Sequence, residues 1–184
     1  MTDWDQATAQ HKEDPNGRAR GAFTHRLIEH LSHGRPLPQH RTLVAALISE
    51  GISETAAQSL ADEILKEVTL CLQEDFFSWL VKQDHPQSYS EWSLEDRPAP
   101  DRIRTGTVDR MVFDGDLWWV VDYKTSRPLG GERVDSFLER ESHLYRPQLH
   151  AYGEMVANYF KVALSSVRTV LYFTTLQRKV EVQP

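Results

Sequence analysis

The sequence contains a single cysteine, Cys71, and no long run of apolar residues. One thiol excludes an internal disulfide, a cysteine-rich zinc site and an iron–sulfur cluster held by the chain's own cysteines. No segment approaches the roughly 20 apolar residues that span a membrane, and the N-terminus is polar, so we expect a cytoplasmic protein without a membrane partner. The phosphate-binding pattern G-x-x-x-x-G-K-[ST] is also missing, which excludes nucleotide hydrolysis through that motif.

Positive charge is scarce as well. The net charge is −6, which disfavours a simple cationic nucleic-acid binder. Residues 1–96 carry 8 Lys and Arg against 16 Asp and Glu, whereas residues 97–184 carry 13 against 11. This asymmetry is compatible with a modest anion-facing surface in the second half only.

The first half of the chain has helical periodicity. Residues 1–17 are polar and lack a period, so we expect a flexible leader followed by a single domain over residues 18–184. The helical part of that domain is expected over residues 18–84. Apolar spacing predicts helices over residues 19–31, 42–49, 54–74 and 75–83, with Ser53 as the N-cap of the third.

After residue 84 the apolar period changes from 3.6 to 2, which marks the sheet core, residues 85–184. Strands are predicted over residues 88–94, 105–113 and 117–124, followed by a flexible loop over 126–136. A helix over 143–160 and two closing strands complete the chain, and Pro147 is expected in the first turn of that helix, where proline is tolerated. This order predicts an α/β fold with a mixed sheet.

Two acidic residues stand inside strands of the stretch TGTVDRMVFDGDLWWVVDYKTS, residues 105–126. If the hairpin turns on Asp-Gly, Asp109 opposes Val120 and is diagonal to Asp122; if it turns on Gly-Asp, Asp109 and Asp122 are directly opposite. Either turn places both carboxylates and Lys124 on one face, with Cβ atoms about 5–8 Å apart. A divalent cation can bridge carboxylates at that separation, because its bonds to oxygen are about 2.0–2.5 Å long.

Without a cation this arrangement is unfavourable, because two like charges on a half-buried face repel. A purely structural alternative remains, in which Lys124 offsets the two acids as an ion pair. Metal binding explains better why both acids and the lysine share one face.

The motifs GTVDR, VVDYKTS and YRPQLHAY, in this order, resemble the PD-(D/E)xK nuclease superfamily, specifically the RecB-like nuclease domain at the C-terminus of bacterial UvrD/AddA-type helicases. The segments RGAFTHRLIEHL, SEWSL and VLYFTT with VEV extend the resemblance over about residues 18–182. It implies a restriction-endonuclease-like mixed sheet flanked by helices, with a helical N-terminal portion. The resemblance implies as metal ligands His25, Asp109, Asp122 and the carbonyl of Tyr123, and as catalytic residues Asp109, Asp122, Lys124, Gln148 and Tyr152, with the role of Glu91 left open.

The same resemblance implies a DNA nuclease that uses Mg²⁺ or Mn²⁺ and acts, as an exonuclease on a single-stranded end, in break repair and recombination. Its implied partner is a helicase region of the same polypeptide or complex. Two alternatives remain: a nuclease-fold module that no longer cuts and serves for DNA binding or docking, and a nuclease that stands alone.

Overall fold

The computed structural model describes residues 15–99 and 101–182, and the chain divides into two compact units, Met1–Gln83 and Asp84–Pro184. Residues 1–14 of the expected leader lie outside the described residues. No helix within the described ranges combines the length and the apolar character needed to cross a membrane. The α/β class, with a mixed sheet and a helical N-terminal part, is confirmed.

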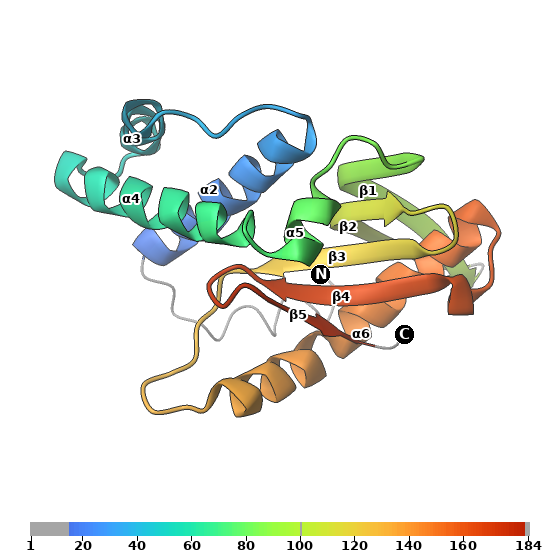
Figure 1. The fold of residues 1–184 in the computed structure, drawn as a ribbon. Helices are drawn as coiled ribbons and strands as arrows, with labels where there is room; N and C mark the ends of the chain where they lie inside the picture. Colours follow the sequence, from blue (N-terminus) through green and yellow to red (C-terminus); the bar gives the residue numbers. More distant parts are fainter. Residues whose placement is uncertain (1–14, 100, 183–184) are drawn as a thin grey trace. The chain divides into compact units, whose positions relative to one another are not determined.

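The N-terminal unit, which we call the helical unit, contains only helices among its described elements (Figure 1). Its apolar cluster is formed by residues four apart on the longer helices, such as Leu60, Ile64 and Val68, because this spacing puts side chains on one helix face. The helices are α2 (Pro15–Ser32), α3 (His40–Ser49), α4 (Glu54–Cys71) and α5 (Asp75–Leu80).

Helix boundaries in this unit differ from the predicted ones for local reasons. The helix predicted from residue 19 begins at Pro15, a residue whose fixed φ and missing N–H suit the first helical turn. Ser53 occupies the N-cap of α4, as predicted, but its hydroxyl makes no capping hydrogen bond. The helix predicted over residues 54–74 ends at Cys71, and the one predicted over residues 75–83 ends at Leu80. The Glu74 carboxylate starts α5 by accepting the N–H groups of Phe76 and Phe77.

The C-terminal unit, which we call the sheet unit, is a five-stranded sheet in the order β1-β2-β3-β4-β5. The first three strands form an antiparallel meander, β4 runs parallel to β3, and β5 closes the edge antiparallel to β4. The strands are β1 (Gln87–Ala99), β2 (Arg102–Phe113), β3 (Trp118–Lys124), β4 (Val167–Phe173) and β5 (Arg178–Glu181).

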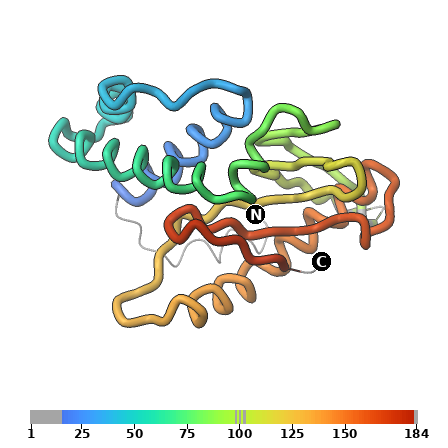
Figure 2. The backbone as a smooth tube through the Cα atoms, in the orientation of Figure 1, coloured from blue at the N-terminus to red at the C-terminus, as the bar shows by residue number. Residues whose placement is uncertain are grey.

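The parallel step from β3 to β4 requires a crossover, which α6 (Val134–Phe160) supplies, followed by the short 3-10 helix η1 (Leu164–Ser166). Figure 1 shows α6 lying along the sheet, and its contacts with β1, β3 and β4 enclose the apolar core of this unit. The chain reaches α6 through the wide loop 125–133, which can be followed in Figure 2.

The expected position of Pro147 was wrong. Helix α6 begins at Val134, nine residues before the predicted start, so that Pro147 lies in its interior. An interior proline removes one backbone hydrogen bond of the helix and clashes with the preceding turn, which kinks or breaks many helices. Here Phe137 is buried on one side of the proline and Leu149 on the other, and this burial holds both halves of the helix in place.

The hairpin between β2 and β3 turns on Gly115 and Asp116. Phe113 pairs with Trp118, and the Asp114 N–H donates to the Leu117 carbonyl at 3.2 Å. Gly115 has φ +108°, a conformation that a side chain would strain. The second of the two predicted turns is therefore the one adopted.

Candidate functional site

Three acidic residues lie in one row across the sheet. The β2–β3 pairing ends with Arg110 opposite Val121, and its continuation places Asp109 opposite Asp122. On the other side of β2, the pairs that flank Glu91 place this residue opposite Asp109. Carboxylates of three adjacent strands therefore occupy neighbouring positions at one level of the sheet.

Glu91 is the residue whose role the sequence left open. Its φ is +47°, in the left-handed region, although the residue lies inside β1 and is not glycine. A carboxylate oxygen of Glu91 lies within 4.8 Å of one of Asp109. A cation with bonds of about 2.4 Å can accept one oxygen from each at that separation.

Asp109 is fixed by the backbone of the next strand. Its Oδ2 accepts the Tyr123 N–H at 2.7 Å. Where the β2–β3 pairing ends, this carboxylate thus replaces the backbone carbonyl that would otherwise accept the N–H. The side chain of Tyr123 alternates to the sheet face opposite Asp122 and packs edge-to-face on Tyr172. Only the backbone of Tyr123 can therefore contact a group bound beside the acids. Its carbonyl remains a predicted metal ligand.

Asp122 and Lys124 lie on the face of β3 that α6 covers. Their side chains are 8% and 16% exposed, and the Lys124 Nζ lies 2.8 Å from the Asp122 Oδ2. Burial lowers the pKa of Lys124, but the charges of Asp122, Tyr145 and Asp109 outweigh it and the net pKa is raised. Lys124 therefore carries a positive charge, and it forms with Asp122 the ion pair of the structural alternative.

These groups fit a divalent cation of the hard type. Carboxylate oxygens are the donors that Mg²⁺ and Mn²⁺ prefer, and the row supplies them from three strands. A cation would also relieve the repulsion between Asp109 and its neighbours, which a single lysine only partly offsets.

Gln148 and Tyr152 are neighbours on α6, as their spacing predicts. The Gln148 Nε2 donates to the Tyr152 Oη at 2.9 Å. Burial raises the pKa of the Tyr152 phenol and the carboxylates of Asp122 and Asp109 raise it further, while the hydrogen bond from Gln148 lowers it. Tyr152 is therefore a neutral phenol close to the acidic row.

Two contacts of this site were missed by the sequence analysis. A Cβ at Gly106 would stand 2.5 Å from the Tyr152 Cε1, so only glycine leaves room for that ring. The ring of Tyr145 lies against Lys124, with its centroid 3.5 Å from the Nζ. A glycine inside a strand pattern signals such a close approach, but the sequence does not reveal which side chain approaches.

His25 lies on α2 in the helical unit. It is half-buried, whereas Phe23, Thr24, Leu27 and Ile28 of the same helix are buried, so His25 lies at the margin of the buried face of α2. That His25 binds a metal ion remains a prediction.

Comparison with known proteins identifies the family to which these features belong. The family model of the PD-(D/E)XK nuclease superfamily matches residues 5–183, which cover most of both compact units. The search of curated proteins gives no match. The matched region contains the mixed sheet, the acidic row and the lysine two residues after Asp122. The chain therefore belongs to the PD-(D/E)XK nuclease superfamily.

Proposed function

We propose that this protein hydrolyses DNA phosphodiester bonds with a divalent cation, Mg²⁺ or Mn²⁺. The observation that carries the proposal is the register of β2 and β3, which puts Asp109 opposite Asp122 in a chain of this nuclease superfamily. The ion pair between Asp122 and Lys124 adds the third charged group of the site.

The proposed ligands are His25, Asp109, Asp122 and the carbonyl of Tyr123. When bound, the cation polarises the scissile phosphate and lowers the pKa of a coordinated water. Oxygen-rich ligation suits Mg²⁺, and one imidazole among the ligands makes Mn²⁺ an equally suitable ion. Glu91, opposite Asp109, adds negative charge that favours either cation.

Lys124 provides the positive charge of the site. Its ammonium group has three N–H donors, and its Nζ lies 2.8 Å from the Asp122 Oδ2. These donors orient the attacking water or stabilise charge that builds up on the phosphate.

Gln148 and Tyr152 are proposed to position the water, Lys124 or the DNA strand. The Gln148 amide donates to Tyr152 and keeps its carbonyl oxygen as an acceptor, while the Tyr152 hydroxyl keeps its proton to donate. The pair can therefore orient a polar group on the acidic row without adding charge.

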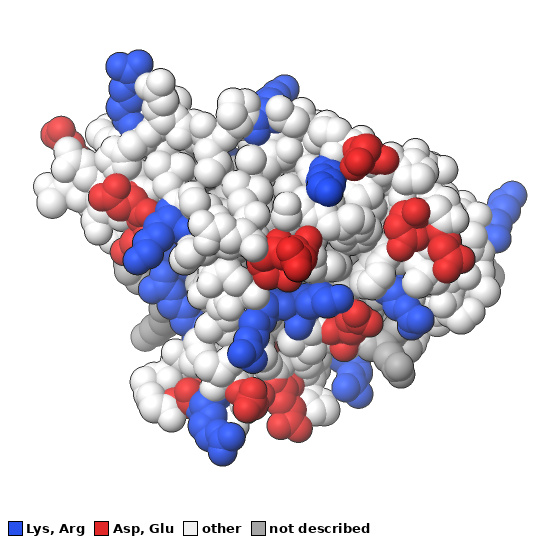
Figure 3. All heavy atoms as spheres, viewed as in Figure 1, with Lys and Arg blue, Asp and Glu red and all other residues white. Residues whose placement is uncertain are grey.

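The biological setting we propose is the C-terminal nuclease domain of a RecB-like helicase-nuclease that acts in double-strand break repair and recombination. On the face drawn in Figure 3, acidic and basic side chains are interspersed, and no large area carries one sign. With a net charge of −6, such a surface holds DNA weakly, because phosphate contacts supply most non-specific affinity. A helicase that feeds a single-stranded end to the site would remove this difficulty, and exonuclease action follows from it.

Cleavage of linear single-stranded DNA in Mn²⁺ tests the proposal. Asp122→Ala is expected to lose activity, whereas Asp116→Ala, an exposed aspartate in the turn of the same hairpin, is expected to keep it. Equal cleavage by wild type and Asp122→Ala would refute the catalytic assignment.

Calorimetric titration with Mn²⁺ separates a nuclease from a module that no longer cuts. Wild type is expected to bind the ion and Asp109→Ala to lose that binding, because Asp109 is a proposed ligand. Binding that is absent in wild type would favour the inert module for DNA binding or docking.

A further inference from the structure

One face of α6 carries a polar stripe formed by Glu141, Tyr145, Gln148 and Tyr152. Intervals of four, three and four residues align these side chains along the helix. The proposed function uses the last two. The first two contact the segment that follows the acidic row, and they have no role so far.

Tyr145 contacts Lys124 through its ring face. The Nζ lies 3.5 Å from the ring centroid, and the lysine side chain is 16% exposed. An ammonium over an aromatic ring is attracted by the negative face of the ring, and more strongly when it is desolvated. The contact therefore restrains a long side chain whose ordering otherwise costs rotamer entropy.

The backbone around Lys124 is held from the other side by the end of β4. The Lys124 carbonyl accepts the Thr174 N–H at 3.0 Å and the Thr174 Oγ1 at 3.2 Å. Two residues on, the Ser126 carbonyl accepts the Thr175 Oγ1 at 2.9 Å. The strand end that presents Lys124 is thus fixed in position independently of α6.

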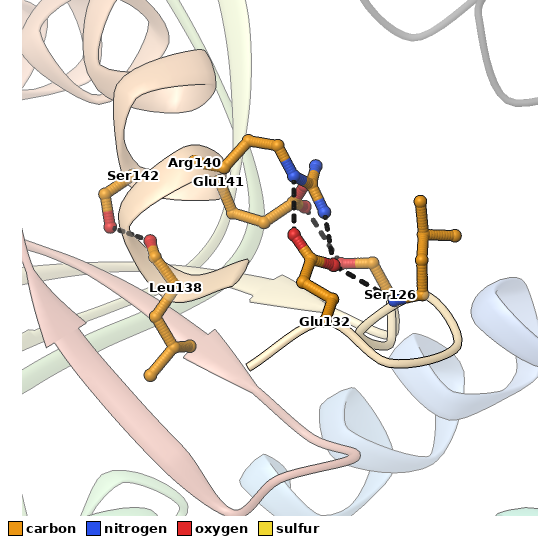
Figure 4. Close-up of polar contacts among 7 residues, drawn as sticks. Ser126, Glu132, Leu138, Arg140, Glu141 and Ser142 are labelled. Atoms are coloured by element: carbon orange, nitrogen blue, oxygen red, sulfur yellow. Dashed lines mark hydrogen bonds and ion pairs between the residues drawn. The ribbon is translucent and has the colours of Figure 1, made fainter. Parts of the chain in front are cut away.

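Glu141, one turn before Tyr145, holds the loop that follows. Its carboxylate is 1% exposed and accepts the Ser126 hydroxyl at 3.0 Å (Figure 4). Arg140 donates to Glu141 and also to Glu132, whose carboxylate accepts the Leu129 N–H at 3.0 Å. These contacts close the first part of loop 125–133 against the start of α6.

We propose that Tyr145 is a positioning residue that holds the Lys124 ammonium on the acidic row, while Glu141 fixes the loop behind it through Ser126. This inference rests on the proposed function. A cation on Asp122 would compete with Lys124 for the same carboxylate, whereas it leaves the Tyr145 ring unchanged. The ring is then the contact that keeps the lysine in one rotamer while the carboxylate binds metal.

The proposal assigns the positioning to the ring, whereas the Tyr145 hydroxyl also interacts with Lys124. Tyr145→Phe and Tyr145→Leu therefore form a matched pair in the full chain that separates the two groups. Tyr145→Leu is expected to lower kcat about tenfold with little change in KM, since the lost contact is of the size that changes a rate by that factor. Tyr145→Phe keeps the ring face and is expected to retain nearly the wild-type kcat. A Phe variant as slow as the Leu variant would overturn the proposal, because the hydroxyl would then be responsible.

A second measurement needs neither metal nor DNA. In protein with ¹³C-labelled lysine, the Hε resonances of Lys124 are expected upfield in wild type and Tyr145→Phe, because of the ring current, and near their ordinary position in Tyr145→Leu. Lys124→Arg assigns the signal. If wild type does not cleave DNA, the proposed function fails, but this spectrum still tests the contact.

Thermal melting shows whether the variants fold, and Tyr145→Met replaces Tyr145→Leu if the latter does not. Lys124 resonances that stay in place when the ring is removed would overturn the inference even if cleavage falls. A kcat reduced together with a displaced lysine signal, and both restored by phenylalanine, would support it.

Discussion

The two compact units treat buried charge differently. Among the described residues, the helical unit buries one charged side chain, Glu67, which pairs with Arg20 of α2. The sheet unit buries Arg110, Asp122 and Glu141. Asp122 belongs to the acidic row, and Glu141 accepts a hydrogen bond from Ser126 in the loop that follows it. Burial of charge is costly unless it is paired, and in the sheet unit Asp122 is paired with Lys124 and Glu141 with Arg140.

Removal of Asp122 tests this difference most strongly. Asp122→Ala leaves the Lys124 ammonium buried without its main partner, and we expect a loss of about 3 kcal/mol in the free energy of unfolding without metal. This is the low end of the usual cost, because Asp109 still favours the ammonium. Urea unfolding with Asp116→Ala as control measures it. A variant as stable as wild type would show that Lys124 reaches solvent easily.

The same Gly→Ala substitution is expected to have opposite signs in the two units. Gly106→Ala in β2 forces the buried Tyr152 ring to move, which should cost about 1–3 kcal/mol and lower kcat. Gly17→Ala in α2 meets nothing within 4 Å and should stabilise the chain by about 0.5–1 kcal/mol through helix propensity. Melting temperatures of both variants decide, and a harmless Gly106→Ala would mean that the ring has room to shift.

Acid should weaken the sheet unit through Asp96. The hydrogen bond from Arg104 lowers the pKa of this carboxyl below its ordinary value of 3.8. Its stabilising contribution is therefore complete above pH 3.8 and is lost as the pH falls through the lower pKa of the folded state. Between pH 7 and pH 2, the melting temperature of Asp96→Asn should fall less steeply at the acid end than that of wild type. Identical slopes of melting temperature against pH would contradict the pairing of Asp96 with Arg104.

The smallest effect is expected for the exposed ion pair of Arg26 and Glu50 in the helical unit. Both side chains are more than half exposed, at 57% and 53%. Glu50→Gln should change the free energy of unfolding by less than about 1 kcal/mol, and less still at high salt. A loss comparable to that of Asp122→Ala would remove the distinction between the two units.

Much of the fold was predictable because it depends on the pattern of apolar and polar residues over short stretches of the sequence. Apolar spacing located α2, α3 and α4, and the change of period located the sheet. The parity of the hairpin placed Asp109 and Asp122 on one face, and side-chain alternation along the strand placed Lys124 there too, as the structure has them. Boundaries were less accurate, since packing of Phe137 and Leu149 lets α6 run through Pro147.

The sequence by itself determined the α/β order of elements and a hairpin with two acids and a lysine, because turn chemistry and side-chain alternation depend only on near neighbours. The tertiary structure decided which of two turns forms, that Glu91 lies opposite Asp109, and that Tyr152 and Tyr145 meet Gly106 and Lys124. These contacts join residues far apart in the chain. Their partners are set by strand order and by the crossover helix, and no local pattern encodes either.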